Sequence, residues 1–166
     1  EERFRLAFET SPDAININRL EDGLYIDIND GFTKLTGFTR EDAIGKTSLE
    51  INVWHDPADR KKLVDGLRTN GYYNNLEAQF RKKDWSVTTA LMSAKVIDLN
   101  GIPHIISITR DISERKIAEK ALLESEEKYR TLFNQSAEGI FLHDTNGRIL
   151  DVNQVACEQS GYSREE

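Results

Sequence analysis

The sequence predicts an α+β domain in which two strands, several short helices and three further strands follow one another along the chain. Runs of alternating apolar and polar residues occur in two groups, at residues 13–29 and 73–110. Between them lie short segments with helix-capping residues at their ends. At 166 residues, the chain is long enough for one full domain with additional segments.

The first group of elements is a short helix followed by a hairpin. Residues 2–9 place Phe4 and Phe8 four positions apart, as on one face of an amphipathic helix. Residues 13–19 and 24–29 alternate apolar and polar side chains on either side of an acidic turn that contains glycine. This pattern predicts a β-hairpin.

Helix signals fill the middle of the chain. Asn29 suits a helix N-cap, and Gly37 suits the left-handed residue that ends such a helix. Thr39 resembles a second capped start. Asp56 precedes a proline and a helical pattern over residues 57–68. Proline suits the first position of a helix, because the amide hydrogen that it lacks would have no partner within the helix there.

The last three strands are predicted at residues 73–81, 86–97 and 102–110. Asn100 and Gly101 separate the final two, and Asn-Gly between alternating runs is a strong hairpin signal. An amphipathic helix follows over about residues 113–133. Steps of four and three residues along it give a short coiled-coil seam, formed by Ala118, Leu122, Ser125, Tyr129 and Leu132.

The sequence also repeats itself at a shift of 125 residues, which becomes 124 after a one-residue gap. Phe8 coincides with Phe133, and Asn29 with Asn153. A repeat of this length predicts tandem domains. We expect an N-terminal helix at residues 1–10, a complete domain at 11–113, a helical linker at 114–135 and the truncated start of a second domain at 136–166.

Four segments of the first copy are distinctive: Leu-Thr-Gly-Phe-Thr-Arg-Glu-Asp at 35–42, His-Asp-Pro-Ala-Asp-Arg at 55–60, Phe-Arg-Lys-Lys-Asp at 80–84 and Thr-Arg-Asp-Ile-Ser-Glu-Arg-Lys at 109–116. Together they resemble the PAS domain family with its C-terminal PAC segment. The resemblance implies a PAS fold: a five-stranded antiparallel sheet with the first hairpin central, short helices over one face and a ligand or partner cavity between them. The second copy is similar to the start of another PAS domain.

Two residues depart from the family pattern. Trp85 stands where the family usually places glycine, so we expect a turn that is not of the glycine-dependent type. Ser113 replaces the threonine of the terminal Asp-Ile-Thr motif and keeps a hydroxyl that can cap the outgoing helix.

Cofactor residues known from this family are missing here. The helix at 57–68 has no histidine to ligate haem, and residues 45–54 have no cysteine for a covalent flavin. The three histidines show no metal-ligand spacing, so no metal site is predicted. Binding of a non-covalent flavin or of a small hydrophobic ligand is still compatible with the sequence. The pocket candidates, which could equally fill a plain core, are Phe32, Leu35, Trp54, Leu63, Leu67, Leu91 and Ile106.

No catalytic motif occurs, so no catalytic residue and no enzymatic activity are predicted for this chain. The net charge of −7 argues against nucleic acid and against direct contact with anionic membranes. A lone cysteine, Cys157, and the lack of an apolar run long enough to span a bilayer fit a cytoplasmic location, although the whole protein could carry a membrane anchor.

By resemblance, we expect a sensory module that passes a ligand or partner state through its C-terminal helix to a downstream output domain, such as a histidine kinase or cyclic-dinucleotide enzyme. Asp111 and Ser113 would anchor the helix start, and the 118/122/125/129/132 seam would transmit the signal and support a homodimer. The alternative is a ligand-free scaffold for dimerisation or protein docking.

Overall fold

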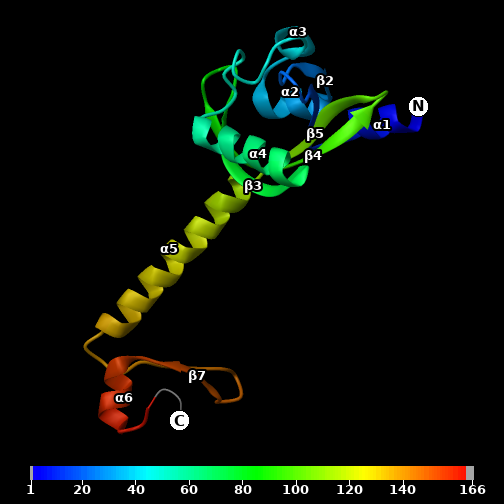
Figure 1. Ribbon diagram of the computed structural model, residues 1–166. Helices are drawn as coiled ribbons and strands as arrows, with labels where there is room; N and C mark the ends of the chain where they lie inside the picture. The colour runs from blue at the N-terminus through cyan, green and yellow to red at the C-terminus, as the bar shows by residue number, and fades with distance from the viewer. Residues whose placement is uncertain (1, 164–166) are drawn as a thin grey trace. The chain divides into compact units, whose positions relative to one another are not determined.

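The computed structural model describes residues 2–163, and these form two compact units that meet between Glu114 and Arg115. The first unit holds the helices α1 to α4 and the strands β1 to β5 (Figure 1). The helix α5 begins at the end of the first unit and continues into the second. Each unit is described separately below.

The sheet of the first unit has five antiparallel strands in the order β2-β1-β5-β4-β3. The predicted α+β fold class is therefore confirmed. The expectation of a central first hairpin is wrong, because β5 pairs with the whole length of β1 on the side away from β2. The strand β2 therefore lies at the edge of the sheet. The strands are β1 (Ala14–Arg19), β2 (Tyr25–Ile28), β3 (Tyr72–Arg81), β4 (Val87–Leu99) and β5 (Ile102–Asp111).

Capping residues set the bounds of the helices that pack on this sheet. Asn29 caps the start of α2, and Gly37 ends it in the left-handed conformation with φ of 76°. Asp56 accepts a hydrogen bond from the Ala58 amide at the start of α4. The helices are α1 (Glu2–Thr10), α2 (Asp30–Thr36), α3 (Arg40–Ala43) and α4 (Pro57–Asn70). Because α2 packs on β1, and α4 packs on β3 and β4, both cover one face of the sheet (Figure 1).

A close approach of backbones fixes α2 against β1. A Cβ atom on Gly31 would lie 2.2 Å from the carbonyl oxygen of Asp13, so this position of α2 has room only for glycine. The core that results contains Phe32 and Leu35 from α2 and Leu63 and Leu67 from α4.

The hairpin between β3 and β4 has a left-handed residue at Trp85, whose φ is 70°. The Lys82 amide donates to the Ser86 carbonyl, and the Trp85 amide donates to the Lys82 carbonyl, so the turn closes normally. The expectation that Trp85 would force another type of turn is wrong. Instead, the tryptophan takes the backbone conformation that glycine adopts most easily.

The second unit consists of the rest of α5 (Ser113–Gln135), the hairpin of β6 (Phe141–His143) and β7 (Ile149–Val152), and α6 (Gln154–Ser160). Residues 164–166 of the predicted second copy lie outside the described residues. Among residues 2–163, no helix combines the length and the apolar character that crossing a bilayer requires.

Candidate functional site

A cavity lies between the helices and the inner face of the sheet. The cavity volume is about 80 Å³, well above the roughly 10–15 Å³ that a single water needs, so the cavity has room for several waters or a small ligand. The lining residues are Ala14, Asn16, Asn18, Gly23, Tyr25, Phe32, Leu35, Thr36, Ser48, Val53, Trp54, Arg60, Leu63, Phe80, Met92, Ile105, Ser107 and Thr109.

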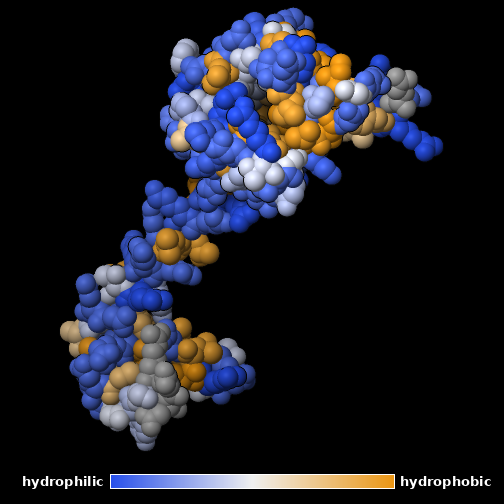
Figure 2. Space-filling view, viewed as in Figure 1, coloured by the Kyte–Doolittle hydropathy of each residue, from blue (hydrophilic) through white to orange (hydrophobic). Residues whose placement is uncertain are grey.

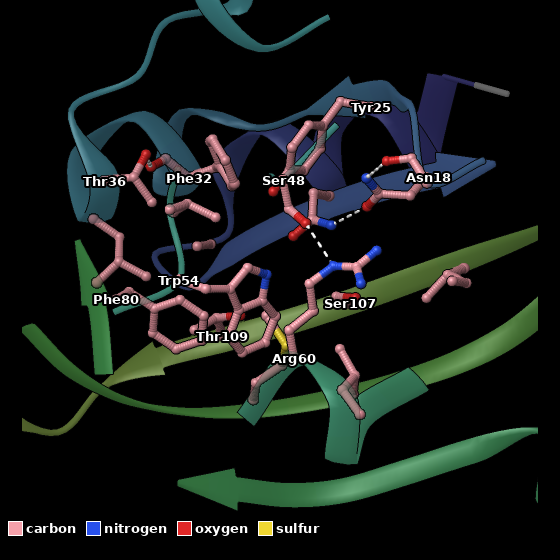
Figure 3. A pocket seen from close by; sticks show the side chains of 18 residues that line it. Asn18, Tyr25, Phe32, Thr36, Ser48, Trp54, Arg60, Phe80, Ser107 and Thr109 are labelled. Carbon is pink, nitrogen blue, oxygen red and sulfur yellow. Dashed lines mark hydrogen bonds between the residues drawn. The ribbon is translucent and has the colours of Figure 1, made fainter. Parts of the chain in front are cut away.

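Aromatic rings gather at one side of the cavity, and a group of polar side chains, called the polar end below, lies at the other. Phe32, Trp54 and Phe80 gather at one side of Figure 3, and the rings of Trp54 and Phe80 lie 4.9 Å apart. The side chains of Asn18, Ser48 and Arg60 lie toward the other side. This division suits a ligand that has an apolar body and one polar group.

Hydrogen bonds hold the side chains of the polar end in place. Asn16 Nδ2 donates to Asn18 Oδ1, and Asn18 Nδ2 donates to the Gly23 carbonyl at 3.0 Å. Arg60 Nε donates to Ser48 Oγ at 3.3 Å (Figure 3). Both asparagines are buried and have hydrogen-bond partners within the protein, whereas Arg60 uses only its Nε nitrogen within residues 2–163.

Two further polar groups of the lining are held away from bulk water. Thr109 is only 3% exposed, and its hydroxyl has no hydrogen-bond partner within residues 2–163. Burial raises the pKa of the Tyr25 hydroxyl, and the nearby charge of Arg60 acts in the opposite direction. Tyr25 is therefore a neutral hydrogen-bond donor at any physiological pH.

Of the seven predicted pocket residues, four line the cavity, one is buried elsewhere in the core, and two lie on the opposite face of the sheet. Phe32, Leu35, Trp54 and Leu63 line the cavity. Leu67 is buried in the core but is not part of the lining.

Leu91 and Ile106 need correction, because they lie on the opposite face of the sheet. Met92, next to Leu91, lines the cavity, as do Ile105 and Ser107 on either side of Ile106. Side chains alternate between faces along a strand, so Leu91 and Ile106 point away from the helices.

The polar lining was missed by sequence reasoning. Asn16 and Asn18 come from β1, and Ser107 and Thr109 come from β5, which pairs with β1. Asn16 and Ser107 are directly opposite in that pairing. The available signal was the alternation of these polar residues with isoleucines, which leaves two possible orientations for each strand.

Contacts at the end of the sheet fix the start of α5. Asp111 Oδ1 accepts from the Ser113 amide at 2.8 Å, and Asp111 Oδ2 accepts from the Thr88 hydroxyl at 3.1 Å. Ser113 Oγ accepts from the Thr89 amide at 3.2 Å. Burial opposes the charged form of Asp111, but the hydrogen bonds from Ser113 and Thr88 outweigh it and hold the pKa of its carboxyl below the ordinary value. Asp111 and Ser113 thus connect β4, β5 and the first turn of α5.

The predicted seam residues all lie on α5 and are exposed in the single chain. Leu122 is 62% exposed, and Tyr129 and Leu132 are likewise exposed. Apolar side chains interrupt the hydrophilic surface of α5 about halfway along it (Figure 2). Ion pairs of Arg115 with Glu119 and of Lys120 with Glu124 support the helix elsewhere on its surface.

The sequence and the fold both match PAS proteins. A family model described as PAS fold matches residues 2–112, and a second, described as PAS domain, matches residues 127–166. The PAS domain of a protein from Colwellia psychrerythraea shares the fold with a TM-score of 0.58 and 24% identity, over 68% of this chain and 97% of that one. This chain belongs to the PAS family.

The curated relatives are signalling proteins. Sporulation kinase E of Bacillus subtilis is 30% identical over 171 residues, which cover 100% of this chain and 22% of the kinase. The methyl sulfide methyltransferase-associated sensor of Methanosarcina acetivorans is 30% identical over 121 residues, which cover 73% of this chain and 12% of the sensor. The chain is thus similar to a minor part of much longer sensors and kinases.

Proposed function

We propose that this chain is a sensory module in which a small ligand in the cavity alters the anchoring of α5 and so signals to an output domain farther along the chain. The observation that carries the proposal is the path of β5. Ser107 and Thr109 of this strand line the cavity, and Asp111, two residues farther on, accepts the Ser113 amide at the start of α5. A shift of β5 at the cavity therefore reaches the helix start within a few residues.

A change at this junction has a defined physical route. Asp111 and Ser113 share Thr88 as a hydrogen-bond partner, so a movement of β5 against β4 alters both contacts together. Two arrangements of these bonds would bias α5 toward different packing against a partner helix. Similarity to kinases and a sensor supports an output domain in cis as the receiver of the signal.

Pairing of α5 between two chains is the second part of the proposal. Leu122, Tyr129 and Leu132 are exposed and fall on one face of the helix. A second copy of the same helix would cover this face as a short parallel coiled coil. The same exposure favours the alternative function, a ligand-free dimerisation scaffold, which differs in that the cavity would have no influence on α5.

We further propose that the module works without haem, flavin or metal. Helix α4 has no histidine that could ligate haem, residues 45–54 have no cysteine for a covalent flavin, and no group of three metal-ligating side chains occurs among the residues that the structure describes. The purified protein should show no absorbance band beyond that of its aromatic residues. A stoichiometric haem or flavin band would contradict this part of the proposal.

Filling the cavity tests the sensory proposal without knowledge of the ligand. Ser107→Leu adds a bulky apolar group to the lining, whereas Ile108→Leu changes the next residue of β5 on the opposite face without changing its volume. Hydrogen exchange of the backbone amides at residues 113–120 should change in Ser107→Leu and not in Ile108→Leu. Unchanged exchange in a folded Ser107→Leu protein would favour the scaffold.

A further inference from the structure

The polar end of the cavity holds a cation, Arg60, that has no acidic partner within residues 2–163. Arg60 lies in the first part of α4, is half-buried and lines the cavity. Its Nε nitrogen donates a hydrogen bond to Ser48 Oγ, but neither terminal nitrogen makes a hydrogen bond or ion pair within residues 2–163. Those two nitrogens present the fork that a carboxylate can accept at both oxygens.

The acids around Arg60 are engaged elsewhere. Asp59 pairs with Lys62 at 2.8 Å, and Asp56 accepts from the Ala58 amide at the start of α4. In the β1–β2 turn, which Arg60 approaches at Gly23, Asp22 pairs with Arg19. The guanidinium is therefore free to bind an acid that comes from outside the chain.

A second observation points independently to a polar ligand. The Thr109 hydroxyl is buried, lines the cavity and has no partner within residues 2–163. A buried hydroxyl without a partner is costly unless something in the cavity bonds to it. Tyr25 adds a neutral donor to the lining, within the electrostatic reach of Arg60.

We propose that the cavity binds a small organic monocarboxylate, with the carboxylate held by Arg60 and a short apolar chain directed toward Phe32, Trp54 and Phe80. The proposal rests on the proposed sensory function and names the ligand class of that site. The charge of Arg60 selects the carboxylate, and the aromatic end selects the chain. The cavity volume of about 80 Å³ favours a short acid.

The test compares two ligands of equal shape on the unaltered chain. Pentanoate and pentanamide differ in charge and hardly in size, so calorimetric titration of each at neutral pH and constant ionic strength isolates the charge. We expect pentanoate to bind one per chain and about ten-fold more tightly than pentanamide, as a charge-assisted bond predicts. Pentanoate that binds no more tightly than pentanamide, or not at all, would overturn the inference. This comparison depends on no variant.

Variants then assign the effect to Arg60. Arg60→Gln should bring the ratio of the two affinities close to one, with the affinity for pentanamide unchanged. Lys61→Gln removes a positive charge from the next, more exposed position of α4 and should leave the ratio as it is. Equal losses in both variants, or a ratio that survives in Arg60→Gln, would overturn the role of Arg60.

The sensory function is tested separately, by measuring hydrogen exchange of the backbone amides at residues 113–120. Pentanamide or 1-pentanol that perturbs NMR signals of Ser107 and Thr109 and alters this exchange would leave the sensory function standing even if the carboxylate inference failed. Tight pentanoate binding without any change at α5 would instead support the carboxylate inference and count against the sensory function.

Discussion

The side chain of Asn29 accepts a 2.7 Å hydrogen bond from the backbone amide of Ile15 and so joins the start of α2 to β1. The same oxygen accepts from the Phe32 amide at 2.9 Å. Its Nδ2 donates to the carbonyls of Phe8 and Asp13, each at 2.9 Å. One buried amide therefore connects α1, β1 and α2.

The second unit contains the same arrangement around Asn153. Its oxygen accepts from the amides of Ile140 and Ala156, and its Nδ2 donates to the carbonyls of Phe133 and Glu138, all at 2.9 Å. A similar sequence has thus produced the same local hydrogen bonding in two places, although the second copy has only part of the fold around it.

Replacing Asn29 with alanine should destabilise the first unit by about 2–4 kcal/mol. Asn29 is 2% exposed, and its loss leaves several buried backbone groups without partners as well as removing the helix cap. Both tryptophans of the chain, Trp54 and Trp85, lie in the first unit, so denaturation followed by tryptophan fluorescence reports on that unit alone.

Asn153→Ala is the matched control for this measurement. It makes the same change at the equivalent position of the second unit and should leave the fluorescence midpoint where it is. An unchanged midpoint in Asn29→Ala would mean that the bonds around Asn29 contribute little to the stability of the first unit.

The left-handed conformation of Trp85 should be measurable as strain. Trp85 is 72% exposed, and its ring lies 5.7 Å from the guanidinium of Arg81, so its replacement also removes a cation–π contact. Trp85→Ala and Trp85→Gly both lose that contact, but only glycine tolerates a φ of 70° without strain. We expect the glycine variant to be about 1 kcal/mol more stable than the alanine variant in urea denaturation. Equal stabilities would show that the turn relaxes on substitution.

The ion pair of Asp42 with Lys83 predicts a pH dependence. The hydrogen bond from Lys83 and that from the Thr39 amide lower the pKa of the Asp42 carboxyl to about 2. Because the folded pKa lies below the ordinary value of 3.8, the carboxylate stabilises the fold at pH above about 4, and this contribution is lost as the pH falls toward 2. Carboxyl chemical shifts followed by NMR should give Asp42 an apparent pKa near 2.

Lys83→Met keeps much of the chain length of lysine but removes its charge. It should move the pKa of Asp42 back toward the ordinary value, whereas Lys61→Met, which breaks an unrelated pair with Asp65, should not. A pKa of Asp42 that does not respond to Lys83→Met would assign the shift to Thr39 instead.

Local signals made most of the elements predictable from sequence. The left-handed Gly37 and the Asn100-Gly101 hairpin lie where their residue types indicate, because such backbone conformations depend on the residue itself. The order of the strands was harder to predict from the sequence. The pairing of β5 with β1 joins segments about 90 residues apart, and no local sequence pattern indicates it.

The candidate site was predictable only in part, for a related reason. The apolar residues Phe32, Trp54 and Leu63 belong to segments that must face the sheet, and they line the cavity as the pattern suggests. On β5, however, isoleucines alternate with Ser107 and Thr109, and hydrophobicity favoured the isoleucines as the lining. The inner face carries the hydroxyls instead, and Ile108 on the other face is 46% exposed.

Self-association through α5 gives the last prediction. Leu122 lies on the predicted seam, whereas Leu123 lies about 100° away around the helix, and the two are similarly exposed at 62% and 57%. If a second copy of α5 covers the seam, Leu122→Glu forces a charge from each chain into an apolar contact and should weaken association at least ten-fold. Leu123→Glu makes the identical change outside the seam and should leave association nearly unaltered. Sedimentation equilibrium of the 166-residue chain over a range of concentrations measures both. Association that is equally strong in all three proteins, or equally weakened by both substitutions, would contradict the seam and leave α5 as a plain helix with no role in association.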